Sequence, residues 1–142
     1  MRGLFVALIV CVLFSCGGSK TNDLTGVNEE IPEGFQLGLQ LFKQRCASCH
    51  GSTGEPQLAL YPPLKNSDYL KNYPNDIPCI IQHGLQGEIV VNGQGYNMKM
   101  ASNPDLTADQ IQGLVNYINN AWGNDFGAKS LGEVKENLTN CK

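Results

Sequence analysis

The chain is 142 residues long; 42% of its residues are hydrophobic, 16% are charged, and the formal net charge at pH 7 is −3. A length of this order leaves room for one domain with a modest hydrophobic core. The acidic balance, 13 Asp and Glu against 10 Lys and Arg, argues against nucleic acid as a partner, because phosphate backbones are bound by clustered basic side chains.

The N-terminus has the pattern of an export signal. Arg2 supplies a positive start, and residues 4–14 form an apolar run that is too short to span a bilayer. The run leads into Leu-Phe-Ser-Cys, which is similar to a bacterial lipoprotein signal with Cys16 as the lipidated residue. We therefore predict a signal peptide over residues 1–15, export to the periplasmic side of a bacterial membrane, and a lipid anchor at Cys16. The alternative is an ordinary cleaved signal with an incidental cysteine.

A flexible tether is predicted between this anchor and the domain, because residues 16–32 are polar and lack hydrophobic periodicity. The domain itself is expected over residues 33–124. Its first helix is predicted to start after Gly34 and to run into Cys46, although alternation of the apolar residues there also suits a strand. The helical face would contain Leu37, Leu41 and Phe42.

The middle of the domain is predicted to consist of loops and short helices. Glycines and prolines forbid a long helix over residues 51–66. Short helices are expected at Asp68–Asn72, with Ser67 as the N-cap, and at Ile77–His83, which ends at a glycine. After them we expect a short extended segment at 87–93 and a loop at 94–104.

The clearest helix signal begins at Thr107. Thr107 and Gln110 have the spacing of a capping box, and an apolar stripe at helical spacing follows them. Gly123 is expected to end this helix, and residues 125–142 to form a polar C-terminal extension with weak periodicity. The stripe consists of Ile111, Leu114, Val115, Ile118 and Trp122.

Five residues, Cys46-Ala47-Ser48-Cys49-His50, carry the chemistry. Two cysteines separated by two residues can each form a thioether to one vinyl group of a haem, and the adjacent histidine can ligate the iron. The motif therefore predicts one covalently bound haem c with its iron. Covalent attachment suits a chain that is too small to enclose the cofactor by packing alone.

Two other interpretations of the motif stay open on the residues alone. A redox-active C-x-x-C of a thiol-disulfide enzyme would be expected within an alternation of strands and helices, which this sequence lacks. A zinc site needs further ligands, and the only other histidine is His83. If the motif holds haem, the second axial ligand of the iron would be Met98, Met100 or His83, since thioethers and imidazoles both bind haem iron.

Further elements resemble the class I cytochrome c family over residues 34–123. Gly38 and Phe42 precede the haem motif at the family's spacing, and Pro62-Pro63-Leu64 follows it. The segments 84–97 and 114–124 are similar to those of bacterial members. The resemblance implies an all-α cytochrome c fold, with three to five helices wrapped around one covalently bound haem and joined by long loops.

The resemblance also implies cofactor-binding residues on the histidine side. The Pro62 carbonyl would accept a hydrogen bond from the His50 ring, which orients the ring and raises its basicity. Leu64 would bind the haem two residues further on, and Tyr61 and Tyr96 would line its crevice.

On the other side of the iron, the resemblance places Met100. The sequence departs from the family pattern here, because Ala101 stands where proline is usual and Met98 offers a rival thioether. A haem ligated by histidine and methionine has no open position for a substrate, so the implied function is single-electron transfer rather than catalysis.

The partners implied by the family are respiratory complexes. These would be a quinol-oxidising complex upstream and a terminal oxidase or a periplasmic reductase downstream. The alternative is a haem peroxidase or ligand-binding haem protein in which the methionine bond is labile.

Two cysteines, Cys79 and Cys141, remain besides those of the leader, the predicted lipid anchor and the haem motif. An even pair in an oxidising compartment predicts a disulfide, which would staple the C-terminal extension to the domain. It would close a loop of roughly 60 residues and contribute about 4 kcal/mol in the chain-entropy model. The alternative is two unpaired thiols.

Overall fold

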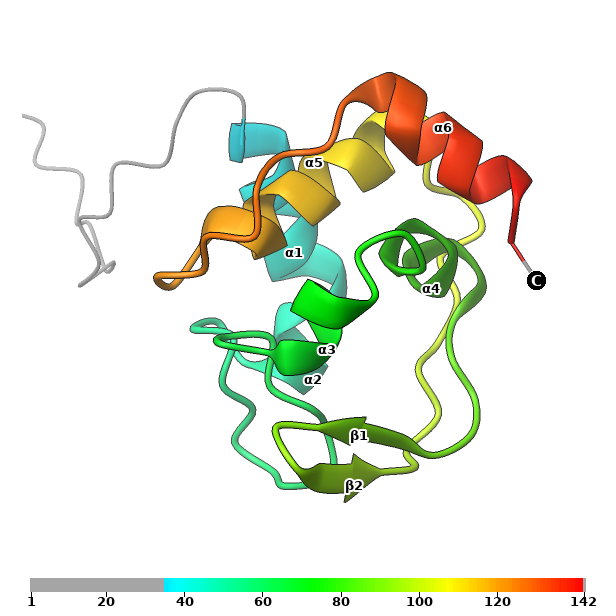
Figure 1. Cartoon of the computed structure of the whole chain (residues 1–142). Helices are drawn as coiled ribbons and strands as arrows, with labels where there is room; N and C mark the ends of the chain where they lie inside the picture. The colour runs from blue at the N-terminus through cyan, green and yellow to red at the C-terminus, as the bar shows by residue number, and fades with distance from the viewer. Residues whose placement is uncertain (1–34, 142) are drawn as a thin grey trace, which may run out of the picture.

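Six α-helices and one β-hairpin follow one another in the computed structural model, which describes residues 35–141 (Figure 1). The all-α fold class is as predicted, with one helix more than the upper number expected. The hairpin turns at Asn92 and Gly93, which both have positive φ, as a tight two-residue turn requires. The helices are α1 (Gln36–Arg45), α2 (Ala47–His50), α3 (Asp68–Asn72), α4 (Ile77–His83), α5 (Ala108–Asn120) and α6 (Leu131–Thr139), and the strands are β1 (Ile89–Val91) and β2 (Gln94–Tyr96).

The core is centred on the crossing of α1 and α5, which meet at two glycines. A Cβ atom on Gly38 would lie 2.6 Å from the carbonyl carbon of Gly113 and 2.7 Å from Cβ of Tyr117. Only glycine therefore allows the two backbones to approach this closely. Phe42 is fully buried beside the crossing, and its ring centroid lies 5.3 Å from that of Tyr117 and 5.0 Å from that of Trp122.

Helix α5 ends at Asn120, three positions before the glycine at which we expected it to end. The backbone is extended at Ala121 and then turns left-handed at Trp122, where φ is +57°. Such a backbone is costly for a bulky residue. The turn is stabilised because it brings the Trp122 ring onto Phe42 and, edge to face, onto Tyr117 at 5.3 Å.

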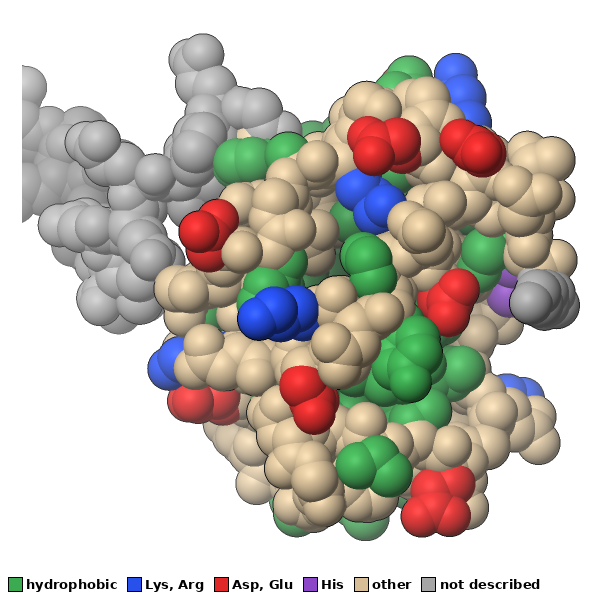
Figure 2. All heavy atoms as spheres, viewed as in Figure 1, with side chains coloured by type: hydrophobic (Ala, Val, Ile, Leu, Met, Phe, Trp, Pro, Cys, Tyr) green, Lys and Arg blue, Asp and Glu red, His purple; other side chains and the backbone are tan. Residues whose placement is uncertain are grey.

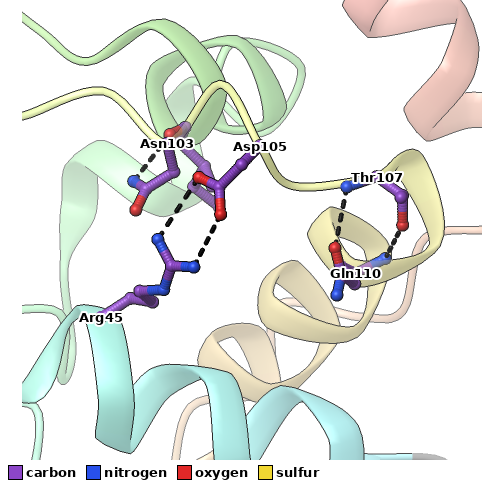
Figure 3. A network of polar contacts seen from close by, with 6 residues as sticks. Arg45, Asn103, Asp105, Thr107 and Gln110 are labelled. Carbon is purple, nitrogen blue, oxygen red and sulfur yellow. Dashed lines mark hydrogen bonds and ion pairs between the residues drawn. The ribbon is translucent and has the colours of Figure 1, made fainter.

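Two helix caps, at the starts of α5 and α3, match the sequence expectation. The Thr107 side chain accepts the amide of Gln110 at 3.3 Å, and the Gln110 side chain accepts the amide of Thr107 at 2.9 Å, as Figure 3 shows. Ser67 caps α3 by accepting the amide of Leu70 at 3.3 Å. These caps satisfy amides that the first turn of a helix leaves without a partner.

The C-terminal extension, residues 125–141 here, is folded onto the domain rather than continuing as a polar tail. It contains α6, which begins with a capping box between Ser130 and Glu133. Val134 is fully buried and belongs to the same core as α5. The helix was missed in the sequence because a single buried valine makes most of its core contact, which leaves the periodicity weak. The Ser-x-x-Glu spacing was a usable signal.

The two cysteines that the sequence leaves over are bonded in the structure. A disulfide joins Cys79 in α4 to Cys141 after α6, across a separation of 62 positions. The bond fastens the end of the extension to the outside of α4.

The N-terminal predictions fall outside the described residues. These are the signal peptide over 1–15, the anchor and tether over 16–32, and lipid attachment at Cys16. Within residues 35–141, the helices are too short or too polar to cross a membrane.

Candidate haem site

The cysteine motif lies at the junction of α1 and α2. Cys46 ends the first helix by donating its amide to the carbonyl of Phe42 at 2.9 Å, and its own carbonyl accepts the amides of Cys49 and His50 at 3.1 and 3.0 Å. These bonds form the single turn of α2, which the sequence did not predict as a helix. Because residues three apart share a helix face, the turn places the two thiols on one side of the junction.

The His50 ring is oriented by one hydrogen bond. Its Nδ1 lies 3.0 Å from the carbonyl oxygen of Pro62, so Nδ1 carries the proton and donates, and Nε2 keeps a lone pair for a metal. Burial lowers the pKa of His50, and the hydrogen bond to Pro62 opposes that shift only in part. Burial therefore favours the neutral ring, the form in which an imidazole can ligate a metal.

The loop that carries Pro62 is itself fixed by hydrogen bonds with two residues, Gly54 and Asn124. The carbonyl of Gly54 accepts the amide of Leu64 at 2.8 Å. Asn124, which is only 6% exposed, donates to the carbonyl of Leu64 at 3.0 Å and accepts the amide of Asn66 at 2.8 Å. Asn124 thus holds the loop against the end of α5. No local pattern marks this asparagine as the residue that holds the loop, because its partners in the loop lie about 60 positions away.

The Cys46 thiol does not have the electrostatics of a redox-active cysteine. Its pKa is raised to about 11, chiefly by burial and also by the neighbouring Cys49, while Arg45 opposes the shift. Reactive cysteines of thiol-disulfide enzymes instead have lowered pKa values. A hydrogen bond with Cys49 also raises the pKa of the Tyr61 hydroxyl, which places Tyr61 beside the attachment turn.

On the methionine side, the distal loop (residues 97–106) is attached to the end of α4. The amide of Met100 donates to the carbonyl of Leu85 at 2.9 Å, and the amide of Leu85 donates to the carbonyl of Met100 at 3.2 Å. Asn103 donates its side-chain amide to the carbonyl of Ile81 at 3.0 Å. Gly84 lies so close that a Cβ there would be 2.5 Å from the Met100 carbonyl oxygen.

The distal loop is also attached to α1. Arg45, in the last turn of that helix, forms a two-pronged ion pair with Asp105 at 2.7 and 3.3 Å (Figure 3). Met98, by contrast, is 49% exposed at the start of the loop, and Tyr96 is half-buried at the end of β2. The structure therefore fixes the backbone at Met100 and leaves Met98 about half exposed.

The sequence of the domain is similar to a known protein family. The sequence model described as "Cytochrome c" matches residues 35–122. This chain belongs to the cytochrome c family. Two proteins named "Cytochrome c-552", both from Thermus thermophilus, are each 32% identical to it over 90 residues. The aligned part covers 61% of this chain in both cases, and 68% and 60% of the two relatives. The chain is thus a class I c-type cytochrome whose cofactor is covalently bound haem c.

The residues of this cytochrome c fit the haem that the family binds. Cys46 and Cys49 are half-buried, and neither forms a disulfide in the structure. Beside them is a hollow of about 300 Å³, within the range of ligand pockets, whose lining includes Cys49, Leu58 and Tyr61. Leu58 and Leu60 are 59% and 53% exposed, so large apolar side chains remain uncovered close to the attachment turn. A flat, largely apolar cofactor would cover such surface.

A second apolar area is exposed near the hairpin. Figure 2 shows hydrophobic side chains gathered between α3, α4 and the hairpin, with acidic and basic side chains interspersed around them. Tyr73, just after α3, and Val90 in β1 are 50% and 59% exposed. Exposed apolar area of this kind is typical of surfaces that contact a cofactor or a partner.

Proposed function

We propose that this cytochrome c is a single-electron carrier with His50 and Met100 as its axial ligands. Haem c supplies an iron that takes up and releases one electron. His50 is oriented by Pro62 so that Nε2 faces away from the carbonyl, and Met100 is held by its paired hydrogen bonds with Leu85. The fixed His50 ring, in a chain that belongs to the cytochrome c family, is the observation that carries the proposal.

Met100 is preferred to Met98 for a physical reason. A ligand that must return to the same position after each electron transfer needs a fixed backbone. The backbone of Met100 is fixed by its bridge to Leu85, whereas Met98 lies outside that bridge and is about half exposed. The contacts of Asn103 and Asp105 give the distal loop the rigidity that Ala101, in place of proline, does not supply.

Replacing Met100 by alanine should abolish the sulfur-to-iron absorption near the red end of the oxidised spectrum, because the thioether is removed. The reduction potential should fall, since a thioether favours the ferrous state. Absorption spectroscopy and redox titration measure both. Met98→Ala is the matched control and should leave the spectrum as it is. The assignment is wrong if Met98→Ala, and not Met100→Ala, removes the absorption.

The second candidate function is a peroxidase or ligand-binding haem protein. The observation that favours it is the exposed Ala101 directly after Met100, because a loop without proline there opens more easily. Rapid binding of carbon monoxide to the reduced wild-type protein would favour this function, and the absence of binding would favour the electron carrier.

The proposed setting is the periplasmic side of a bacterial membrane, with a lipid at Cys16. The support is the lipoprotein-like sequence before Cys16. Several acyl chains, at about 0.8 kcal/mol per buried methylene, would keep the carrier near a quinol-oxidising complex and a terminal oxidase or periplasmic reductase, which raises its effective concentration there.

Cys16→Ser should therefore move the haem-staining protein from the membrane fraction to the soluble periplasmic fraction. Removing the thiol removes the acceptor of the lipid. The fractions are compared by haem staining after cell fractionation, with Cys79→Ser as the control for loss of a cysteine elsewhere. An unchanged membrane fraction in Cys16→Ser would contradict lipid anchoring.

A further inference from the structure

The C-terminal extension is bound along α5 by a row of side-chain amides. Asn116 donates to the carbonyl of Lys129 at 3.0 Å and accepts the amide of Lys129 at 2.7 Å. Gln112 donates to the same carbonyl at 3.0 Å, and Asn119 donates to the carbonyl of Gly127 at 3.1 Å. Because Asn116 and Asn119 are buried, these bonds fix the path of the extension before α6 begins.

Helix α6 then packs on both α5 and α4, as Figure 1 shows. Val134 enters the common core, and the disulfide fastens Cys141 to Cys79 in α4. Ile77 and Ile81, one helical turn apart, are both buried on the core side of α4. Cys79 lies between them in sequence and is therefore on the other side of the helix. Helix α4 is thus held from two sides, by the core and by the extension.

Helix α4 has only seven residues, and isolated helices shorter than about 12 residues are marginal in water. Its position therefore depends on what it packs against. The distal loop is hydrogen-bonded to α4 and to the residues that follow it. The Asn103 side chain donates to the carbonyl of Ile81, and the Met100 backbone is paired with that of Leu85. An outward movement of α4 would carry the Met100 backbone with it.

We infer that the extension, through the disulfide between Cys79 and Cys141, is a positioning element for the Met100 ligand. It acts on α4 from outside and keeps the distal loop closed over the iron. This role rests on the proposed His50/Met100 ligation. The extension lies outside the family match, which ends at residue 122.

The test is the double variant Cys79→Ser/Cys141→Ser of the haem-loaded protein. Carbon monoxide binds the reduced iron only when the methionine has left, so its association rate follows the fraction of open loop. We expect association about tenfold faster than in the wild type, and a weaker sulfur-to-iron absorption at temperatures well below melting. Val134→Ala keeps the disulfide but weakens the packing of α6. It should also speed carbon monoxide association and weaken the sulfur-to-iron absorption.

A matched control separates positioning from simple loss of stability. Leu41→Ala removes a buried side chain from α1, which packs mainly on α5 and α2 rather than on α4. Each variant is measured the same number of degrees below its own melting temperature. The inference is overturned if the double variant binds carbon monoxide at the wild-type rate, or if Leu41→Ala accelerates binding equally. Should the double variant fail to give haem-loaded protein, Val134→Ala is judged by the same criteria.

The outcome also separates this inference from the proposed function. If Met100 is not the ligand, Met100→Ala leaves the absorption intact. If Met100 is the ligand but the extension does not position it, Met100→Ala removes the absorption while the disulfide variant retains it in full.

Discussion

Alanine at Gly38 is expected to lower the free energy of unfolding of the haem-loaded protein by about 3 kcal/mol, the upper end of the usual cost of overpacking. The added Cβ would lie 2.6 Å from the Gly113 carbonyl carbon and 2.7 Å from Cβ of Tyr117. Both neighbours are close to the backbone of α5, so no side-chain rotation relieves the clash and the helices must separate. The melting temperature, measured by circular dichroism, should fall by about 12 °C or more.

Gly132→Ala is the matched control for this variant. Gly132 lies in the first turn of α6, and the nearest atom to an added Cβ is the Ser130 Oγ at 3.9 Å. Alanine there relieves the entropic cost of a helical glycine and should stabilise by about 0.5 kcal/mol. A Gly38→Ala protein that melts together with the wild type would show that α1 and α5 do not cross at these glycines.

Alanine at His50 is expected to remove the haem ligand on the attachment side and, with it, the spectrum of a six-coordinate haem. The sulfur-to-iron absorption of the oxidised form should disappear as well, because it reports the intact pair of ligands. The Pro62 carbonyl, which accepts from Nδ1 at 3.0 Å, would lose its donor. An unsatisfied carbonyl costs up to about 1–3 kcal/mol when fully buried; Pro62 is partly buried, so the melting temperature should also fall, by less than a full loss would give. Absorption spectra and thermal melts measure the two effects.

The other histidine of the chain provides the control. His83 is the exposed last residue of α4, and His83→Ala should leave the spectrum and the melting temperature close to those of the wild type. A spectral change in His83→Ala together with an unchanged spectrum in His50→Ala would reverse the assignment of the ligand.

Features that depend on near neighbours in the chain were predictable. Ser67 and Thr107 mark the starts of α3 and α5, because each cap bonds an amide three positions on. The cysteine motif was readable for the same reason, since its two thiols and imidazole lie within five consecutive residues.

Features that depend on distant partners were not predictable in this way. Asn124 holds the loop that carries Pro62 through partners about 60 positions away, and an asparagine after a helix carries no sign of that role. The end of α5 was misjudged because the aromatic packing of Trp122 outweighs its left-handed backbone. The resemblance to the family supplied the pairing of His50 with Pro62, which spacing alone could not provide.

The disulfide between Cys79 and Cys141 changes the topology of the chain as well as its contacts. It closes a covalent ring that contains α4 from Cys79 onward, the hairpin, α5 and α6, and leaves α1, α2 and α3 outside it. Within an oxidised, denatured ensemble, α4 and α6 are neighbours along the ring although they are far apart in sequence. Their packing then behaves as a local contact, because the disulfide has already removed the entropy that closing the loop between α4 and α6 would otherwise cost during refolding.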